Sequence, residues 1–370
     1  MKTPIQKILF GSPGTGKSHT IDKVIIPNDL GITSPENIIK TVFHPEYTYG
    51  DFMGKLVPIT ISGKVEYNFY EGHFLKSLSQ AYKNILNAHD KQGVKVSEPE
   101  NVALVIDEIN RGNSSAIFGT IFQLLDRDEE GCSSYGINIT EIEMKKLLQL
   151  MGTQFLEKDG KLDKYELHPF GAVQIKTFQE KISFLKLDVV NKIIRIPPNL
   201  SILATMNTSD NSIYFMDSAF KRRWDWEFVN WDDTKPPVAT YGTGETLDED
   251  KWKKLIKNLN GFIKSHHTSI RGIEDKQIGY YFIKQPVTAE QIQNKLMFFL
   301  WDSVFNRDKK PLVKLLNVEI DELVTFGDFT KLHNEFITNI MNLNVWIGLK
   351  SLLENNSFSF LTLHVWFFKL

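Results

Sequence analysis

The chain carries the stretch Gly11-Ser12-Pro13-Gly14-Thr15-Gly16-Lys17-Ser18, which fits the phosphate-binding pattern G-x-x-x-x-G-K-[ST]. Apolar residues 8–10 before it predict a buried strand, and residues 19–24 after it can open a helix. A glycine-rich turn in that context directs backbone N–H groups at one point and favours bound phosphate. We expect Lys17 to reach the β- and γ-phosphates and Ser18 to bind Mg²⁺. The expected nucleotide contacts are Gly11, Ser12, Pro13, Gly14, Thr15, Gly16, Lys17, Ser18 and His19.

Composition narrows the class of protein. The 370 residues include 43 Lys and Arg against 45 Asp and Glu, a formal net charge of −2. The chain as a whole is therefore no strongly basic nucleic-acid binder, although a local basic patch stays open. Cys132 is the one cysteine, which excludes an intrachain disulfide and a cysteine zinc site and predicts a cytoplasmic protein. No apolar run of 18 residues predicts a membrane span, and residues 1–6 lack a signal-peptide core.

Further along, the pattern predicts an α/β domain with a parallel sheet flanked by helices. Strands are expected near 37–43, 102–106, 200–206 and 224–228, of which 102–106 and 200–206 are expected to be buried. A hairpin is expected at 56–69, and helices at 72–88 and 117–125. Residues 133–195 are too long for one connection, so we expect an insertion with its own secondary structure, including a helix over 141–156.

The sequence predicts two domains. The first covers residues 1–235, with no domain expected before the phosphate loop, and a Pro- and Gly-rich stretch at 236–249 marks the boundary. The second, residues 245–370, is expected to be a helical lid with helices near 250–265, 288–305 and 328–342. It ends in an aromatic tail at 358–368, expected to pack on that domain.

Asp107 and Glu108 follow the buried strand at 102–106. Phosphoryl transfer needs a held metal and an oriented water more than covalent chemistry from the protein. At the carboxyl end of a strand, Asp107 can hold Mg²⁺ together with Ser18, and Glu108 can orient and deprotonate the attacking water. Asn207 ends the strand at 200–206, where it can reach the γ-phosphate or the same water, and Asp210 could share that task.

Cations that stabilise the transition state can come from a neighbouring subunit. Arg222 and Arg223 in a Lys-Arg-Arg run, and Arg111 just past Glu108, are the candidates. Such a run is also compatible with an ordinary solvated surface.

The order of phosphate loop, Asp-Glu strand, Asn strand, Arg run and helical domain resembles the AAA+ superfamily. Four segments are similar to the McrB group, the motor subunits of modification-dependent restriction systems: residues 44–52, 107–113, 117–119 and 206–213. The resemblance implies that Asp107 and Glu108 form the Walker B pair and that Asn207 and Asp210 belong to the Met-Asn-Thr-x-Asp loop. Arg111, Arg222 and Arg223 become the trans-acting residues. Residues 275–282 are similar to a second-sensor segment, but no arginine stands there.

By resemblance, the protein is a Mg²⁺-dependent nucleoside triphosphatase that forms a homo-oligomer, a hexameric ring, with a McrC-like nuclease subunit. It would act on DNA through that partner or through the ring's pore. The phosphate loop does not distinguish ATP from GTP. Two alternatives stay open: a MoxR-like AAA+ remodelling chaperone, and a nucleotide-dependent assembly scaffold with little hydrolysis.

Overall fold

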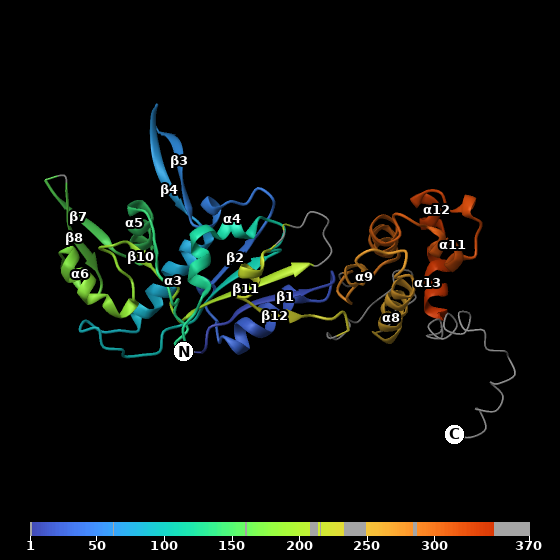
Figure 1. Ribbon diagram of the computed structural model, residues 1–370, viewed down its shortest axis with the longest axis horizontal. Helices are drawn as coiled ribbons and strands as arrows, with labels where there is room; N and C mark the ends of the chain where they lie inside the picture. The colour runs from blue at the N-terminus through green and yellow to red at the C-terminus, as the bar shows by residue number, and fades with distance from the viewer. Residues whose placement is uncertain are drawn as a thin grey trace, which may run out of the picture. The chain divides into compact units, whose positions relative to one another are not determined.

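The computed structural model describes residues 2–61, 63–159, 161–207, 214, 216–232, 249–283 and 287–343. Contacts within the chain define two compact units (Figure 1). The first consists of residues 1–10 and 17–228, and the second of residues 11–16 and 229–370.

A five-stranded sheet forms the centre of the first unit, with the strand order β12-β1-β11-β5-β2. β12 pairs in parallel with β1, and β5 pairs in parallel with both β11 and β2. All five residues 102–106 of β5 are buried, because helices such as α3 cover the sheet. The predicted parallel α/β core is confirmed. The strands are β1 (Gln6–Gly11), β2 (Ile38–Val42), β5 (Val102–Asp107), β11 (Leu200–Asn207) and β12 (Asp225–Phe228).

Short helices and one hairpin connect these strands. The predicted hairpin is β3 (Gly54–Ile61) paired with β4 (Lys64–Glu71), and the predicted amphipathic helix is α3 (His73–Asn87). The helix expected over 117–125 is instead α4 followed by a 3₁₀ segment, Gly119–Leu125. The other elements are α1 (Lys17–Thr20), a π-helical segment (Ile21–Asp29), a 3₁₀ turn (Pro35–Asn37), α2 (Tyr49–Phe52), α4 (Ser114–Phe118) and α7 (Ser218–Lys221).

Residues 133–195 contain several helices and strands and belong to the first unit. A three-stranded antiparallel sheet, β7-β8-β9, lies beside α6, and β6 pairs with β10. The helix predicted over 141–156 is too long: it ends at Leu150, Gly152 adopts a φ of +100°, and a strand begins at Gln154. The elements are β6 (Ile137–Asn138), α5 (Glu141–Leu150), β7 (Gln154–Lys158), β8 (Lys161–Leu167), β9 (Gly171–Val173), α6 (Ile175–Lys181), a 3₁₀ turn (Ser183–Leu185) and β10 (Ile193–Ile194).

The described residues of the second unit from 249 onward are mainly helical. α8 (Glu249–Ser265) matches the helix predicted over 250–265, and its buried Trp252 donates from Nε1 to the Tyr280 carbonyl at 3.1 Å. Residues 233–248 and 344–370, which include the predicted boundary and the aromatic tail, lie outside the described residues. The remaining elements are α9 (Ile273–Lys276), α10 (Ala289–Gln291), π-helical segments Ile292–Met297 and Leu300–Val304, α11 (Lys310–Leu316), a 3₁₀ turn (Ile320–Glu322), α12 (Phe326–Lys331) and α13 (His333–Asn342).

Among the described helices, none combines the length and the apolar character that crossing a membrane requires.

Arg127 ties together the first unit near the start of β11. Its guanidinium donates to the carbonyls of Gly131 at 2.9 Å and Leu200 at 2.8 Å, and to the Gln6 side chain at 3.1 Å. Burial lowers the pKa of Arg127 to about 10, still well above neutrality, so the group stays charged. A buried cation bonded to several carbonyls fixes the strand ends that it joins.

We expect Arg127→Met to lower the free energy of unfolding by about 2–4 kcal/mol, because it leaves buried carbonyls without their donor. Denaturant unfolding followed by circular dichroism measures the change. Lys83→Met, on the exposed side of α3, is the control and should stay within about 0.5 kcal/mol of the wild type. Equal midpoints for the two variants would contradict a structural role for Arg127.

Candidate active site

The candidate site lies at the carboxyl ends of β5 and β11. The chain leaves β1 toward β2 at one edge of the sheet, whereas it leaves β11 toward β12 at the other edge. Where neighbouring strands send their connections in opposite directions, an open parallel sheet forms a crevice outside its carboxyl ends. Ligands bind in this crevice in such folds, so the strand order predicts a ligand-binding site at this edge of the sheet.

Asp107 ends β5 and accepts two hydrogen bonds on the same oxygen. Ser18 Oγ donates to Asp107 Oδ1 at 3.0 Å, and Thr205 Oγ1 donates to it at 2.8 Å. The predicted metal ligands Ser18 and Asp107 are therefore adjacent. A carboxylate and a hydroxyl oxygen are the hard ligands that Mg²⁺ prefers, so these residues fit the predicted ion.

Glu108 has an unusual backbone conformation. Its φ is +55°, in the left-handed region that residues other than glycine rarely adopt. Its N–H donates to Thr205 Oγ1 at 3.3 Å, and its Oε1 accepts from Asn207 Nδ2 at 2.6 Å. Such outliers persist where surrounding contacts determine the geometry, and they concentrate at functional sites. The two residues predicted to act on water, Glu108 and Asn207, are thus in direct contact.

Lys17 is the first residue of α1 and is only 7% exposed. Burial lowers the pKa of Lys17 to about 8, and the negative charge of Glu108 only partly offsets this effect. A buried ammonium group interacts strongly with any anion that replaces its lost hydration.

Residues 11–16 belong to the second unit, where they contact the segment similar to a second sensor. The Pro13 carbonyl accepts from the Gly279 N–H and the Gly14 carbonyl from the Tyr281 N–H, both at 2.9 Å. Gly14, with a φ of +76°, has no room for a side chain, because a Cβ there would lie 2.4 Å from the Phe282 nitrogen. The loop's carbonyls are therefore turned toward residues 279–281.

The arginine candidates differ in their surroundings. Arg111 and Arg222 are exposed, on the loop after β5 and at the end of α7 respectively. The Arg223 side chain is only 8% exposed and donates to Asp126 Oδ2 at 2.7 Å, with its guanidinium 3.9 Å from the centre of the Phe122 ring. This is the environment of an intramolecular structural residue, so Arg111 and Arg222 are the better trans-acting candidates. Asp210 lies outside the described residues.

Sequence reasoning missed Thr205 and Asn110. Thr205 connects Asp107 to the backbone of Glu108, and Asn110 Nδ2 donates to the Asn207 carbonyl at 2.7 Å. The available signal for Thr205 was a hydroxyl near the end of an otherwise apolar run, Ile202 to Met206. Asn110 is 1% exposed, which is uncommon for an amide side chain on a loop.

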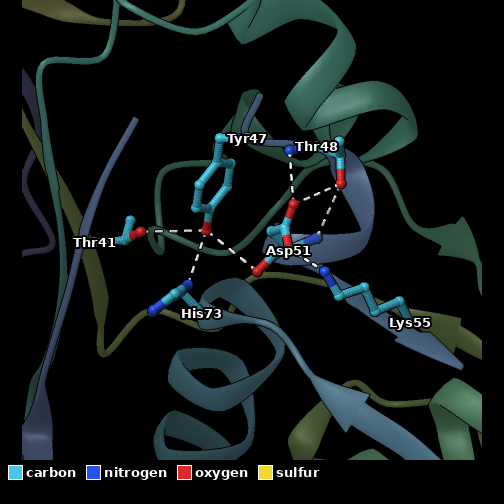
Figure 2. A network of polar contacts seen from close by, with 6 residues as sticks. All are labelled: Thr41, Tyr47, Thr48, Asp51, Lys55 and His73. Atoms are coloured by element: carbon cyan, nitrogen blue, oxygen red, sulfur yellow. Dashed lines mark hydrogen bonds and ion pairs between the residues drawn. The ribbon is translucent and has the colours of Figure 1, made fainter. Parts of the chain in front are cut away.

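A second polar cluster is centred on the segment 44–52, which follows β2. Its members are Thr41, Tyr47, Thr48, Asp51, Lys55 and His73 (Figure 2). The buried Tyr47 hydroxyl is 3.2 Å from Thr41 Oγ1 and 2.8 Å from His73 Nδ1. Burial raises the pKa of Tyr47 to about 12 and lowers the pKa of His73. Burial also favours protonation of Asp51, but hydrogen bonds from Lys55 and Thr48 outweigh it and lower the Asp51 pKa to about 2. At neutral pH the cluster thus contains a neutral Tyr47–His73 pair and an ionised Asp51.

This cluster is connected to the loop that follows β5. The Phe43 N–H donates to the Asp107 carbonyl at 2.9 Å, and a Cβ on Gly112 would lie 3.1 Å from the His44 carbonyl. Tyr47 stacks on Phe43 with ring centres 4.8 Å apart. The cluster also lines a pocket of about 420 Å³, but the Asp51 carboxylate there is already paired with Lys55. We therefore interpret the segment as a support for the loop that carries Asp107 and Glu108.

No protein-family model matches the chain. It is 26% identical over 346 residues to the Type II restriction enzyme BsuMI component YdiS of Bacillus subtilis (strain 168), covering 85% of this chain and 82% of that one. It is 24% identical over 216 residues to the Type IV methyl-directed restriction enzyme EcoKMcrB subunit of Escherichia coli (strain K12). That match covers 58% of this chain and 33% of the E. coli subunit.

Both relatives are named as parts of restriction enzymes, and one of them is an McrB subunit. The longer match covers most of both chains, so it extends into both units described above. These similarities confirm the resemblance predicted from the motifs: the chain is a relative of the McrB-type proteins of restriction systems.

Proposed function

We propose that this chain is a Mg²⁺-dependent AAA+ nucleoside triphosphatase and the motor subunit of a McrB-like restriction system in the cytoplasm. The observation that carries the proposal is the connected network of Ser18, Asp107, Thr205, Glu108 and Asn207 at the carboxyl edge of the sheet. A metal-ligand pair and a carboxylate positioned for water are the parts that phosphoryl transfer requires.

Each residue has a distinct role in the proposed reaction. The Lys17 ammonium and the backbone N–H groups of residues 11–16, except Pro13, which has none, bind the phosphates, in keeping with the sequence pattern. Ser18 and Asp107 hold Mg²⁺, which when bound neutralises charge on the β- and γ-phosphates. Glu108 accepts a proton from the attacking water, and the Asn207 amide fixes the orientation of that carboxylate.

The proposed active form is a closed ring, a hexamer, in which an arginine of one subunit completes the site of the next. Arg111 and Arg222 are exposed and can take this role. A McrC-like nuclease subunit and DNA are the proposed partners, on the basis of the McrB-type resemblance and the two relatives. Dilution that dissociates the protein should then lower turnover per chain.

The motor, chaperone and scaffold hypotheses predict different stimulation of nucleotide hydrolysis. Duplex DNA together with a nuclease subunit should stimulate a restriction motor, whereas a protein client should stimulate a MoxR-like chaperone. An assembly scaffold would bind nucleotide and oligomerise with little hydrolysis. Parallel assays with ATP and GTP would define the base, because the phosphate loop contacts only the phosphates.

Glu108→Gln should reduce NTP hydrolysis by about 10²–10⁴-fold while nucleotide binding is retained, because the amide can still accept from Asn207 but cannot take a proton. Steady-state phosphate release and equilibrium binding of a fluorescent nucleotide measure the two properties. Unchanged turnover and unchanged nucleotide-dependent assembly would exclude Glu108 as the base and remove the motor hypothesis.

Thr205→Val should lower kcat about 10–100-fold and raise the Mg²⁺ concentration needed for half-maximal rate, because Asp107 loses one of its two donors. Thr205→Ser keeps the hydroxyl and should restore most of the activity. A Mg²⁺ titration of both variants distinguishes positioning of Asp107 from a packing effect. If Ser fails to rescue, the hydroxyl is not the relevant group.

Arg222→Ala and Arg223→Ala should behave differently although the residues are adjacent. Arg222→Ala should impair hydrolysis at least tenfold with little effect on unfolding, because its side chain is exposed. Arg223→Ala should destabilise the fold by about 2–4 kcal/mol, because Asp126 loses its partner in a mostly buried pair. Turnover and denaturant unfolding of both variants check this, and a wild-type rate for Arg222→Ala would exclude it as the trans-acting residue.

A further inference from the structure

The first helix of the second unit, α8, has one apolar and one basic side. Trp252, Leu255, Leu259 and Ile263 face the core and are fully buried. At 3.6 residues per turn, the opposite sector of about a third of the circumference contains mainly lysines. The exposed residues of this basic face are Asp250, Lys253, Lys254, Lys257, Gly261, Lys264 and Ser265.

Among the exposed residues of this face, one acidic residue, Asp250, stands against four lysines, so the face carries a net positive charge. Among the described residues, Lys253, Lys254, Lys257 and Lys264 form no ion pair or hydrogen bond through their side chains. Lys253 and Lys257 are four residues apart, and Lys254 and Lys257 are three apart, so the like charges are neighbours on the helix. Such pairs destabilise a helix by roughly 0.2–0.5 kcal/mol each, whereas ordinary solvated helices alternate the signs.

Gly261 is in the middle of the basic face. A glycine in a helix interior costs roughly 1 kcal/mol relative to alanine. Packing within the protein does not require it, because among the described residues no atom beyond its chain neighbours and the backbone of its own helix lies within 4 Å of the position that a Cβ would occupy. An exposed helix position without a side chain lets an external surface approach the backbone closely.

We propose that the basic face of α8 binds the phosphate backbone of duplex DNA. Lys253, Lys254, Lys257 and Lys264 provide the cations, and Gly261 provides the space for a phosphate strand between them. The lysine row and the glycine both reduce the stability of the helix. When a polyanion binds, its negative charges offset the repulsion between the lysines. The choice of DNA rather than another polyanion rests on the proposed role in a restriction system.

The dimensions of the face agree with a duplex. From Lys254 to Lys264 the helix rises about 15 Å, and phosphates follow one strand of a duplex at about 3.4 Å along the axis. The row therefore spans about four phosphates. Lysine is a flexible point charge without a planar fork, so contacts of this kind position the protein on DNA and carry no base sequence.

The test compares two triple variants of the full chain that make the same change in net charge. Lys253→Gln/Lys257→Gln/Lys264→Gln neutralises the basic face. Lys158→Gln/Lys164→Gln/Lys176→Gln neutralises exposed lysines of the insertion and is the control. Binding of a fluorescein-labelled 30-base-pair duplex of arbitrary sequence is measured by anisotropy from 50 to 200 mM salt, without nucleotide.

We expect the α8 triple variant to lose about a hundredfold in affinity at 100 mM salt and to reduce the slope of log K against log salt by about 3. The control should match the wild type. Gly261→Leu keeps every charge and favours the helix, yet it should weaken binding about tenfold with the salt slope unchanged.

Several outcomes would overturn the inference. These are equal affinity and slope for the two triple variants, no duplex binding by the wild type at 50 mM salt, or equally strong competition by polyglutamate of the same charge. Each of them leaves the proposed NTPase function intact if the protein hydrolyses nucleotide. Conversely, α8-dependent duplex binding without any NTP hydrolysis would support the inference and contradict the proposed function.

Discussion

The hydroxyl of Thr205 resolves a geometric problem in the candidate site. Consecutive residues of a regular strand point to opposite sides of a sheet, so Asp107 and Glu108 would point apart if β5 continued unchanged. The left-handed backbone at Glu108 ends that alternation and keeps both residues at the same edge. The Thr205 hydroxyl donates to Asp107 and accepts from the Glu108 N–H. One side chain therefore fixes both residues on either side of the change in backbone conformation.

The energetic cost of the left-handed backbone at Glu108 and the stabilisation by its hydrogen bonds are of similar size. A left-handed conformation costs a residue with a side chain about 1–2 kcal/mol. Each net hydrogen bond returns about 0.5–1.5 kcal/mol, and the bond from Asn207 to the Glu108 carboxylate, as a charge-assisted bond, returns more. The two bonds of Glu108, to Thr205 and from Asn207, therefore offset this cost. The backbone bond from Phe43, which follows β2, to Asp107 further supports the same loop.

The sequence allowed the parallel sheet to be predicted, and also the placement of Asp107, Glu108 and Asn207 at the ends of its strands, because a motif and a buried strand reinforce each other. It could not distinguish Arg222 from Arg223, since the two residues are adjacent in the turn after α7 and only the fold decides which one meets Asp126. The role of Thr205 could not be predicted, because a hydroxyl in a buried strand can have many different hydrogen-bond partners. The helix over 141–156 was overextended because its apolar residues continue into β7.

The grouping of residues 11–16 with the second unit affects how this protein can be divided. A fragment that stops near residue 230 would retain the complete sequence motif but lose the N–H groups of Gly279 and Tyr281 that bind the Pro13 and Gly14 carbonyls. Those carbonyls would then bond to water, and the loop would lose two of the hydrogen bonds that fix its conformation. The smallest piece of this chain that preserves its phosphate loop is therefore longer than the α/β unit that the motif introduces.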